Sequence, residues 1–148
     1  MSIGSKMKRV RLRHWLAAAI GAMAMAPMAT HAGGDAGSAS GSSWRNPSNS
    51  VHIRLTPCGA DRMCGTVIWA SEKAKADARR GGTDQLVGAN LFREFRRVSQ
   101  DEYKGRVFVP DLNRTFSGQM KLQGDSMIGK GCVLGGLICK QQVWKRIS

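Results

Sequence analysis

Short runs in which apolar and polar residues alternate are the feature that most limits how this chain can fold. In residues 51–56, Val51, Ile53 and Leu55 alternate with polar residues, and Pro57 ends the run. A period of two is typical of a strand with one buried face. Further strands are predicted at residues 64–70, 106–109, 114–122, 126–130 and 141–147, and one more at about 86–92. Short strands separated by turns at intervals of about 8–12 residues indicate an all-β sandwich or barrel.

A polar segment at about 71–82 interrupts this pattern. It is rich in Glu, Lys, Ala and Arg, which favour a helix, and it has almost no apolar face. Ser71 is placed to cap a helix, and the pair Gly81-Gly82 is placed to end it. We therefore expect a surface insert that forms either a turn or two of helix or a loop.

The first 32 residues have the pattern of an export signal. A positive segment at residues 6–13 is followed by an apolar run at 15–26. Thr30 and Ala32 are small residues at the third and first positions before Gly33, so cleavage is expected near Ala32, directly after it. The apolar run is shorter than the roughly 20 residues that span a bilayer, so we expect no transmembrane segment in the mature chain. These features predict a periplasmic or secreted protein.

Removing this signal leaves a linker and one domain. Residues 33–43 are almost all Gly, Ala and Ser, which predicts a flexible linker, and the domain is expected at 44–148. Five of the 23 Lys and Arg leave with the signal, and none of the 10 Asp and Glu, so the net charge falls from +13 to +8. A basic domain suits anionic partners in the cell envelope. Nucleic acid is not expected as a partner, because an exported protein seldom meets it.

Four cysteines form two close pairs, Cys58 with Cys64 and Cys132 with Cys139. Four cysteines allow three pairings, and we favour the one that joins near neighbours. A zinc site is the alternative, but paired structural zinc ligands usually have about two to four residues between them. Thiols of exported proteins also oxidise. We therefore expect disulfides and no metal.

Support for catalysis is weak in this sequence. His52 is the one histidine outside the expected signal, and it lies on the polar face of a predicted strand. The adjacent Asp101 and Glu102 would face opposite ways in a strand, whereas paired-carboxylate catalysis needs convergent side chains. No phosphate-binding glycine motif or nucleophile elbow is present. We expect a protein that is not an enzyme and has no cofactor.

One basic cluster stands beside aromatic residues. Arg93, Arg96 and Arg97 lie close to Phe92 and Phe95. Such a cluster is most often a solvated face, and where it binds, its target would be anionic. We keep these three arginines as a candidate anion-binding surface.

The motif Cys-Gly…Cys-Gly-x-x-x-Trp, which runs from Cys58 to Trp69, resembles the signature of a family of small exported bacterial proteins of unknown function. Segments 86–88, 103–110, 114–118 and 143–146 agree with it. The resemblance implies a single small antiparallel lipocalin-like (calycin) β-barrel. It also implies a contact between Trp44 in the first strand and Arg146 near the last.

Two functions follow from this expected barrel. A small barrel can hold one ligand inside, so we expect a non-catalytic protein that binds a small, partly apolar ligand. Candidate lining residues are Trp69, Phe108, Phe116 and Met120. The alternative is a surface binder of an anionic envelope partner, such as a lipid head group, an acidic glycan or a protein.

Overall fold

The computed structural model describes residues 41–148. The expected signal peptide, its cleavage site and residues 33–40 of the expected linker lie outside the described residues.

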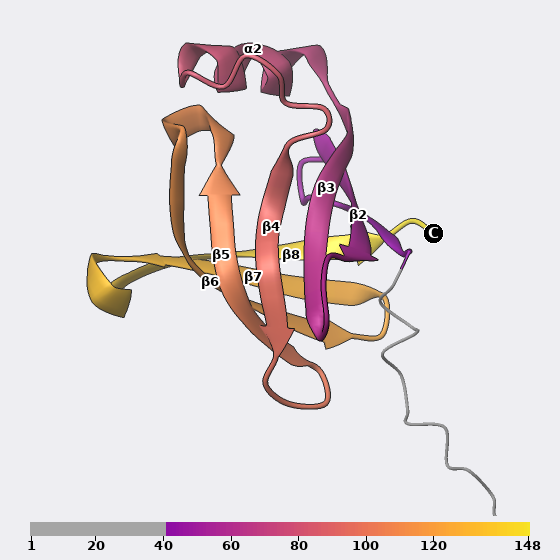
Figure 1. Cartoon of the computed structure of the whole chain (residues 1–148). Helices are drawn as coiled ribbons and strands as arrows, with labels where there is room; N and C mark the ends of the chain where they lie inside the picture. Colours follow the sequence, from indigo (N-terminus) through magenta and orange to yellow (C-terminus); the bar gives the residue numbers. More distant parts are fainter. Residues whose placement is uncertain (1–40) are drawn as a thin grey trace, which may run out of the picture. The chain divides into compact units, whose positions relative to one another are not determined.

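Within residues 41–148, eight antiparallel strands close into one barrel, each strand pairing with the next and β8 returning to β1 (Figure 1). The all-β class predicted from alternation is therefore confirmed, and of the two architectures that it allowed, sandwich or barrel, the structure shows the barrel. The strands are β1 Ser43–Arg45, β2 Val51–Pro57, β3 Arg62–Ala70, β4 Asn90–Arg97, β5 Glu102–Val109, β6 Arg114–Gln123, β7 Ser126–Val133 and β8 Ile138–Arg146. The helix α2 spans Glu72–Arg80, and the two 3₁₀ turns are η1 Pro110–Leu112 and η2 Leu134–Gly136.

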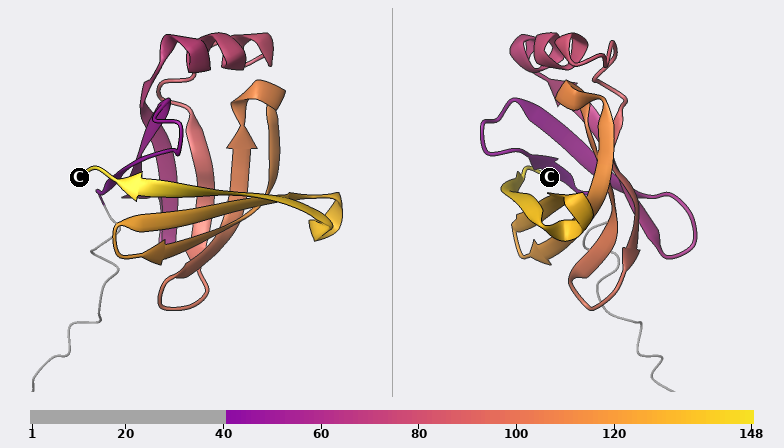
Figure 2. Two further views of the ribbon diagram at one scale, coloured as in Figure 1. Left: turned by 180° about the vertical axis from the view of Figure 1, so that it is seen from behind. Right: turned by 90° about the vertical axis from the view of Figure 1, so that its left-hand side faces the viewer.

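The predicted polar insert is helical, as α2. The Ser71 hydroxyl accepts a hydrogen bond from the backbone N–H of Ala74 at 3.2 Å, and the helix ends at Gly81. α2 lies across the end of the barrel at the β5–β6 turn (Figure 1, Figure 2). A Cβ on Gly81 would lie 2.1 Å from the backbone oxygen of Asp111, so glycine permits this close approach. Ala78 is fully buried where α2 meets the barrel.

The start of the domain differs from the sequence prediction. Gly41, Ser42 and Ser43, which the sequence places in the linker, belong to the barrel. The Gly41 N–H donates to the Leu55 carbonyl at 2.7 Å, and the Leu55 N–H donates to the Ser42 carbonyl at 2.9 Å. The Trp44 indole N–H donates to the Ser42 hydroxyl at 2.8 Å, and Ser42 and Ser43 are both buried. Ser42 and Ser43 are therefore part of the barrel wall and not of a linker.

The strand predicted at about 86–92 is misplaced, because β4 covers Asn90–Arg97. Glu94 has a φ of +52° and lies in a bulge, which adds a residue to the strand. Phe92 and Phe95 therefore both face the interior although they are three residues apart. A spacing of three residues between two inward side chains does not fit a period of two, so the sequence does not show where this strand lies.

Aromatic rings fill the middle of the barrel. The ring centroids of Phe92 and Phe95 lie 5.4 Å apart, and those of Phe92 and Trp144 lie 5.8 Å apart, both in edge-to-face geometry. All three side chains are buried. The rings fit because the neighbouring strands present glycine, which leaves room for them. The glycines that face these rings are Gly65, Gly105, Gly118 and Gly129.

Candidate binding surface on the outer wall

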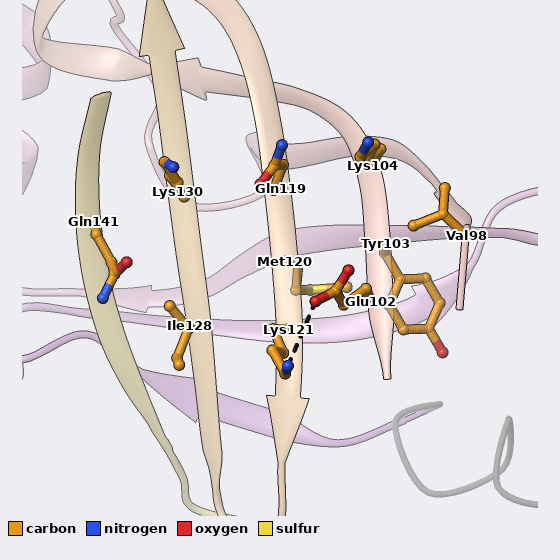
Figure 3. A pocket seen from close by; sticks show the side chains of 10 residues that line it. All are labelled: Val98, Glu102, Tyr103, Lys104, Gln119, Met120, Lys121, Ile128, Lys130 and Gln141. Atoms are coloured by element: carbon orange, nitrogen blue, oxygen red, sulfur yellow. Dashed lines mark hydrogen bonds and ion pairs between the residues drawn. The ribbon is translucent and has the colours of Figure 1, made fainter. Parts of the chain in front are cut away.

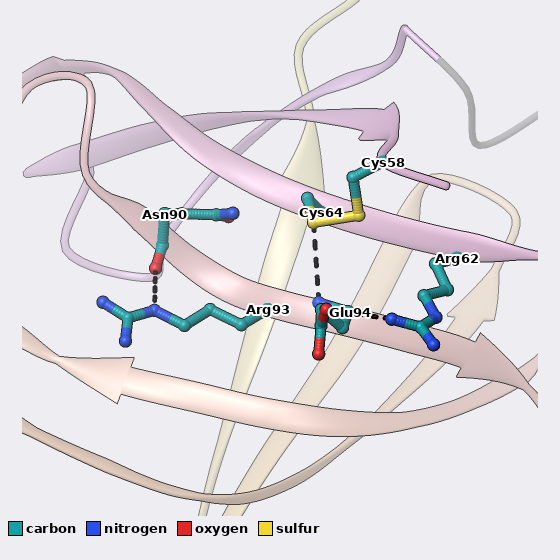
Figure 4. The surroundings of a disulfide bond; sticks show 6 residues. All are labelled: Cys58, Arg62, Cys64, Asn90, Arg93 and Glu94. Carbon is teal, nitrogen blue, oxygen red and sulfur yellow. Dashed lines mark hydrogen bonds and ion pairs between the residues drawn. A yellow bond between two sulfur atoms is a disulfide. The ribbon is translucent and has the colours of Figure 1, made fainter. Parts of the chain in front are cut away.

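Both disulfides join near neighbours, which confirms the predicted pairing. Cys58 and Cys64 lie beside the β4 bulge, where the Cys64 sulfur accepts the Glu94 N–H at 3.5 Å and Arg62 pairs with Glu94 at 2.9 Å (Figure 4). Cys132 and Cys139 lie opposite each other on β7 and β8. No cysteine is left free, so these residues brace the fold.

Two of the four candidate lining residues face the interior. Met120 is buried and pairs across the strands with buried Tyr103. Phe116 is half-buried and pairs with Val107, which packs against the core. The inner wall is therefore apolar where these residues of β5 and β6 lie.

Trp69 lies outside the barrel, in contrast to the prediction. Val67 pairs with Ile53 and Trp69 pairs with His52, so Ile68 is an extra residue between two successive pairs. This bulge shifts the alternation by one residue and turns Trp69 outward, where it is 45% exposed. Its ring lies 4.6 Å from the His52 ring, centroid to centroid.

Phe108 is buried and belongs to the hydrophobic core cluster, against which its neighbour Val107 also packs. Its cross-strand partner on β6 is Thr115. The guanidinium of Arg93 lies 4.3 Å from the centre of its ring. Phe108 is therefore a core residue whose ring also carries a cation.

The three arginines of the predicted anion-binding cluster do not act as one set. Arg93 donates to the Asn90 carbonyl at 3.0 Å and covers Phe108, so its guanidinium is engaged within the barrel wall (Figure 4). Arg97 donates to the Ser99 carbonyl at 3.2 Å in the β4–β5 turn. Only Arg96 of the three is exposed without a partner in the part of the chain that the structure describes.

Strand register places other cations next to Arg96. Arg96 lies directly opposite Lys104, and Arg93 lies directly opposite Arg106. Lys130 lies two strands beyond Lys104 in the same cross-strand row. We call Arg96, Lys104, Arg106 and Lys130 the cationic wall.

The cationic wall has no internal neutralisation. Among residues 41–148, none of its four members forms an ion pair. Like charges directly opposite each other on a sheet are destabilising, by a few tenths to about 1 kcal/mol for a pair. The wall therefore carries a cost that no described contact offsets, and it is open to an anion.

A partly open groove of about 200 Å³ lies over β5 to β8 and includes part of the wall (Figure 3). One cross-strand row of its lining runs in the order Lys104, Gln119, Lys130, Gln141. This row alternates ammonium groups with amides. Adjacent strands lie about 4.8 Å apart, so the backbones that carry the two lysines are about 10 Å apart. Glu102 and Lys121, which form an ion pair at 3.4 Å, also line the groove, so this carboxylate is already neutralised by a lysine.

Sequence reasoning missed Lys104, Arg106 and Lys130 as site residues. Lys104 and Arg106 alternate with Gly105 and Val107, a local signal that both face outward. The missing information was the register, which alone places Lys104 opposite Arg96 and in line with Lys130.

The described residues also contain no group of three or more His, Cys, Asp or Glu placed to hold a metal ion. No helix among them is long and apolar enough to cross a membrane.

Comparison with known proteins gives one family. Residues 42–146 match the family described as "Uncharacterized protein conserved in bacteria (DUF2147)". No curated protein and no solved structure matches the chain. The match covers almost the whole barrel, from Ser42, before β1, to Arg146, the last residue of β8. The chain therefore belongs to the DUF2147 family of bacterial proteins.

Proposed function

We propose that this protein is a non-catalytic binding protein that holds an acidic glycan of the cell envelope on its outer wall. The observation that carries the proposal is the pair Arg96 and Lys104, two exposed cations that lie directly opposite each other and form no ion pair with any carboxylate of residues 41–148. A bound anion would neutralise both at once, so binding would remove a repulsion that the free barrel contains.

The groove beside this pair supports a glycan as the anion. The ammonium groups of Lys104 and Lys130 can bind carboxylates or phosphates as charge-assisted hydrogen-bond donors. In the same row, Gln119 lies between the two lysines and Gln141 lies beyond Lys130. Their amides can both donate hydrogen bonds to sugar hydroxyls and accept them. A chain of acidic sugars presents both kinds of group in alternation, whereas a simple anion would use only the lysines.

The interior gives less support to the other expected function, binding of a small apolar ligand. Phe116 and Met120 do face inward, but Phe92, Phe95 and Trp144 occupy the middle of the barrel. A Cβ on Gly129 would already lie 3.3 Å from the Phe92 ring. A ligand at that level would have to displace a packed aromatic side chain.

Two further parts of the proposal concern fold type and location. A lipocalin-like barrel is supported by the contact that the sequence resemblance implies, because the Arg146 guanidinium lies 4.6 Å from the Trp44 ring centre. Export to the periplasm or the medium is supported by the closed disulfides, which persist in oxidising compartments.

The test measures binding of oligogalacturonate, an acidic sugar chain, by isothermal titration calorimetry. Replacing Arg96 and Lys104 with glutamate should weaken binding by at least about tenfold, since each charged hydrogen bond contributes roughly 1.5–3 kcal/mol. The matched control, Arg54→Glu with Arg79→Glu, makes the same change in net charge at two exposed sites on β2 and α2 and should bind as the unchanged protein does.

A further variant separates a glycan from a simple anion. Gln119→Ala with Gln141→Ala keeps every charge and should still weaken oligogalacturonate binding. Equal losses in the wall variant and in its charge-matched control would mean that only net charge matters, and the proposed site would be rejected. Binding of anionic lipid vesicles but not of the sugar would assign the wall to head groups instead.

A further inference from the structure

The β7–β8 hairpin projects beyond the wall of the barrel and ends in the turn η2 (Figure 1, Figure 2). Every residue from position 134 to position 142 is exposed, so this part of the hairpin is covered on neither face. Its end is apolar. Leu134 is 69% exposed, Leu137 85% and Ile138 54%. We call residues 134–138 the hairpin tip.

The backbone conformation at position 134 is unfavourable for leucine. Leu134 has a φ of +51°, in the left-handed region that residues with a Cβ rarely adopt, and Gly135 and Gly136 follow it with φ of +66° and +98°. Glycine or asparagine would hold this conformation with less strain. The side chain also faces water. No contact within the described part of the chain offsets either cost, so the leucine requires an explanation outside folding.

The tip is held stiffly and stands in a cationic surrounding. Cys132 and Cys139 are directly opposite each other and are disulfide-bonded at the base of the tip. Lys130 and Lys140 flank this disulfide, and residues 126–148 contain no Asp or Glu. Apolar side chains thus project from a braced two-stranded arm that carries only positive charge.

We propose that the hairpin tip inserts into the interfacial layer of a lipid bilayer that carries anionic head groups. Interfacial segments bury their apolar side chains about 5–10 Å into this layer. Leu137 closes η2, two positions from Cys139, and is 85% exposed, so the apolar side chains of the tip can enter this layer while the disulfide stays near the surface. Lys130 and Lys140 then lie at the level of the head groups, where cations are attracted.

The shape of the tip favours a bilayer over a protein partner. A stable protein interface buries about 800 Å² on each side and needs complementary surfaces. The tip offers only a few apolar side chains at the end of a narrow arm. A bilayer accepts apolar side chains without any matching shape. This inference does not depend on the proposed glycan site, which lies on other side chains, apart from Lys130.

The experiment measures insertion of the purified protein into vesicles of phosphatidylcholine with and without phosphatidylglycerol. A tryptophan introduced as Leu137→Trp should shift its emission to shorter wavelength when phosphatidylglycerol vesicles are added, and lipids brominated on their acyl chains should quench it. Tryptophan at Leu112, an exposed leucine of η1, is the matched control and should show neither effect.

A second pair of variants measures the energy of insertion. Leu137→Asp should lower partitioning onto phosphatidylglycerol vesicles by at least about tenfold, because the variant loses the free energy of burying a leucine side chain in the bilayer. Leu112→Asp should leave partitioning unchanged. Both positions are exposed, and circular dichroism should show that both variants fold.

Three results would overturn the inference. The first is equal partitioning of Leu137→Asp and the unchanged protein onto the vesicles. The second is the absence of quenching of a tryptophan at position 137 by brominated lipids. The third is self-association of the protein in solution that Leu137→Asp abolishes, without any binding to vesicles. The proposed glycan site is judged separately. Leu137→Asp should keep oligogalacturonate binding, and the Arg96 and Lys104 double variant should keep quenching at position 137.

Discussion

Replacing Gly105 with alanine tests whether the interior of the barrel is filled. A Cβ at this position would lie 2.8 Å from the carbonyl oxygen of Arg93, from the Cα of Phe95 and from the Cδ2 of the Phe95 ring. Two of these three atoms are backbone of β4, the strand that is paired with β5. Neither can move by rotation of a side chain, so the methyl group can fit only if the two strands separate.

The size of the effect follows from this contact. Overpacked cores lose about 1–3 kcal/mol, and a clash with backbone lies at the upper end of that range. A loss of about 2–3 kcal/mol should lower the Tm by roughly 10–20 °C for a domain of this size. Urea unfolding followed by circular dichroism would give the free energy of unfolding, and a thermal scan would give the Tm.

Gly131 provides the matched control. It also lies within a strand with an ordinary φ, but a Cβ there would meet no atom within 4 Å. Gly131→Ala should therefore be neutral or more stable by up to about 0.5–1 kcal/mol, because alanine loses less backbone freedom on folding. Equal stability of Gly105→Ala and Gly131→Ala would refute the reasoning. The barrel would then have space beside Phe95, and an internal ligand would become the better proposal.

Three other predictions concern the parts that frame the barrel. Ser71→Ala removes the cap of α2 and should weaken that helix by about 1 kcal/mol, measured as faster amide hydrogen exchange in α2. The hydrogen bond from Lys73 holds the pKa of Asp77 below its ordinary value of 3.8. The stabilisation of α2 from this carboxylate is therefore complete above pH 3.8 and is lost as the pH falls through the lower folded pKa, and Asp77→Asn should remove this pH dependence of exchange. Arg146→Gln should cost about 0.5–2 kcal/mol in urea unfolding, because the guanidinium that lies over Trp44 is lost.

The sequence predicts the fold wherever its pattern is local. Strands β2, Val51–Pro57, and β6, Arg114–Gln123, alternate without interruption, and the predicted ranges 51–56 and 114–122 agree with them to within a residue. A bulge breaks that agreement, since one extra residue reverses the face of all that follow. Ile68 has this effect on β3 and Glu94 has it on β4, and for this reason simple alternation predicts the wrong face for Trp69.

The candidate site was less predictable because it depends on neighbours that are distant in sequence. Arg96 and Lys104 are eight positions apart, and Lys104 and Lys130 lie on strands separated by β6. Proximity in sequence predicts a cluster of Arg93, Arg96 and Arg97 instead, yet Arg93 and Arg97 are engaged in hydrogen bonds to backbone carbonyls. Register depends on turns and bulges along the whole barrel, and no short segment contains it.

The interior residues of this barrel favour its stability, whereas some exterior residues oppose it. Inside, glycines on four strands accommodate the rings of Phe92, Phe95 and Trp144, so each local choice agrees with dense packing. Outside, Arg96 faces Lys104 and Leu137 faces water, choices that oppose stability. In a protein with a net stability of only about 5–15 kcal/mol, such costs are significant, and conflicts of this kind mark functional sites in natural proteins. The repulsion between Arg96 and Lys104 lies on β4 and β5, and the exposed Leu137 lies at the turn between β7 and β8. A bound anionic partner would neutralise the two cations, and a bilayer would take the leucine out of water.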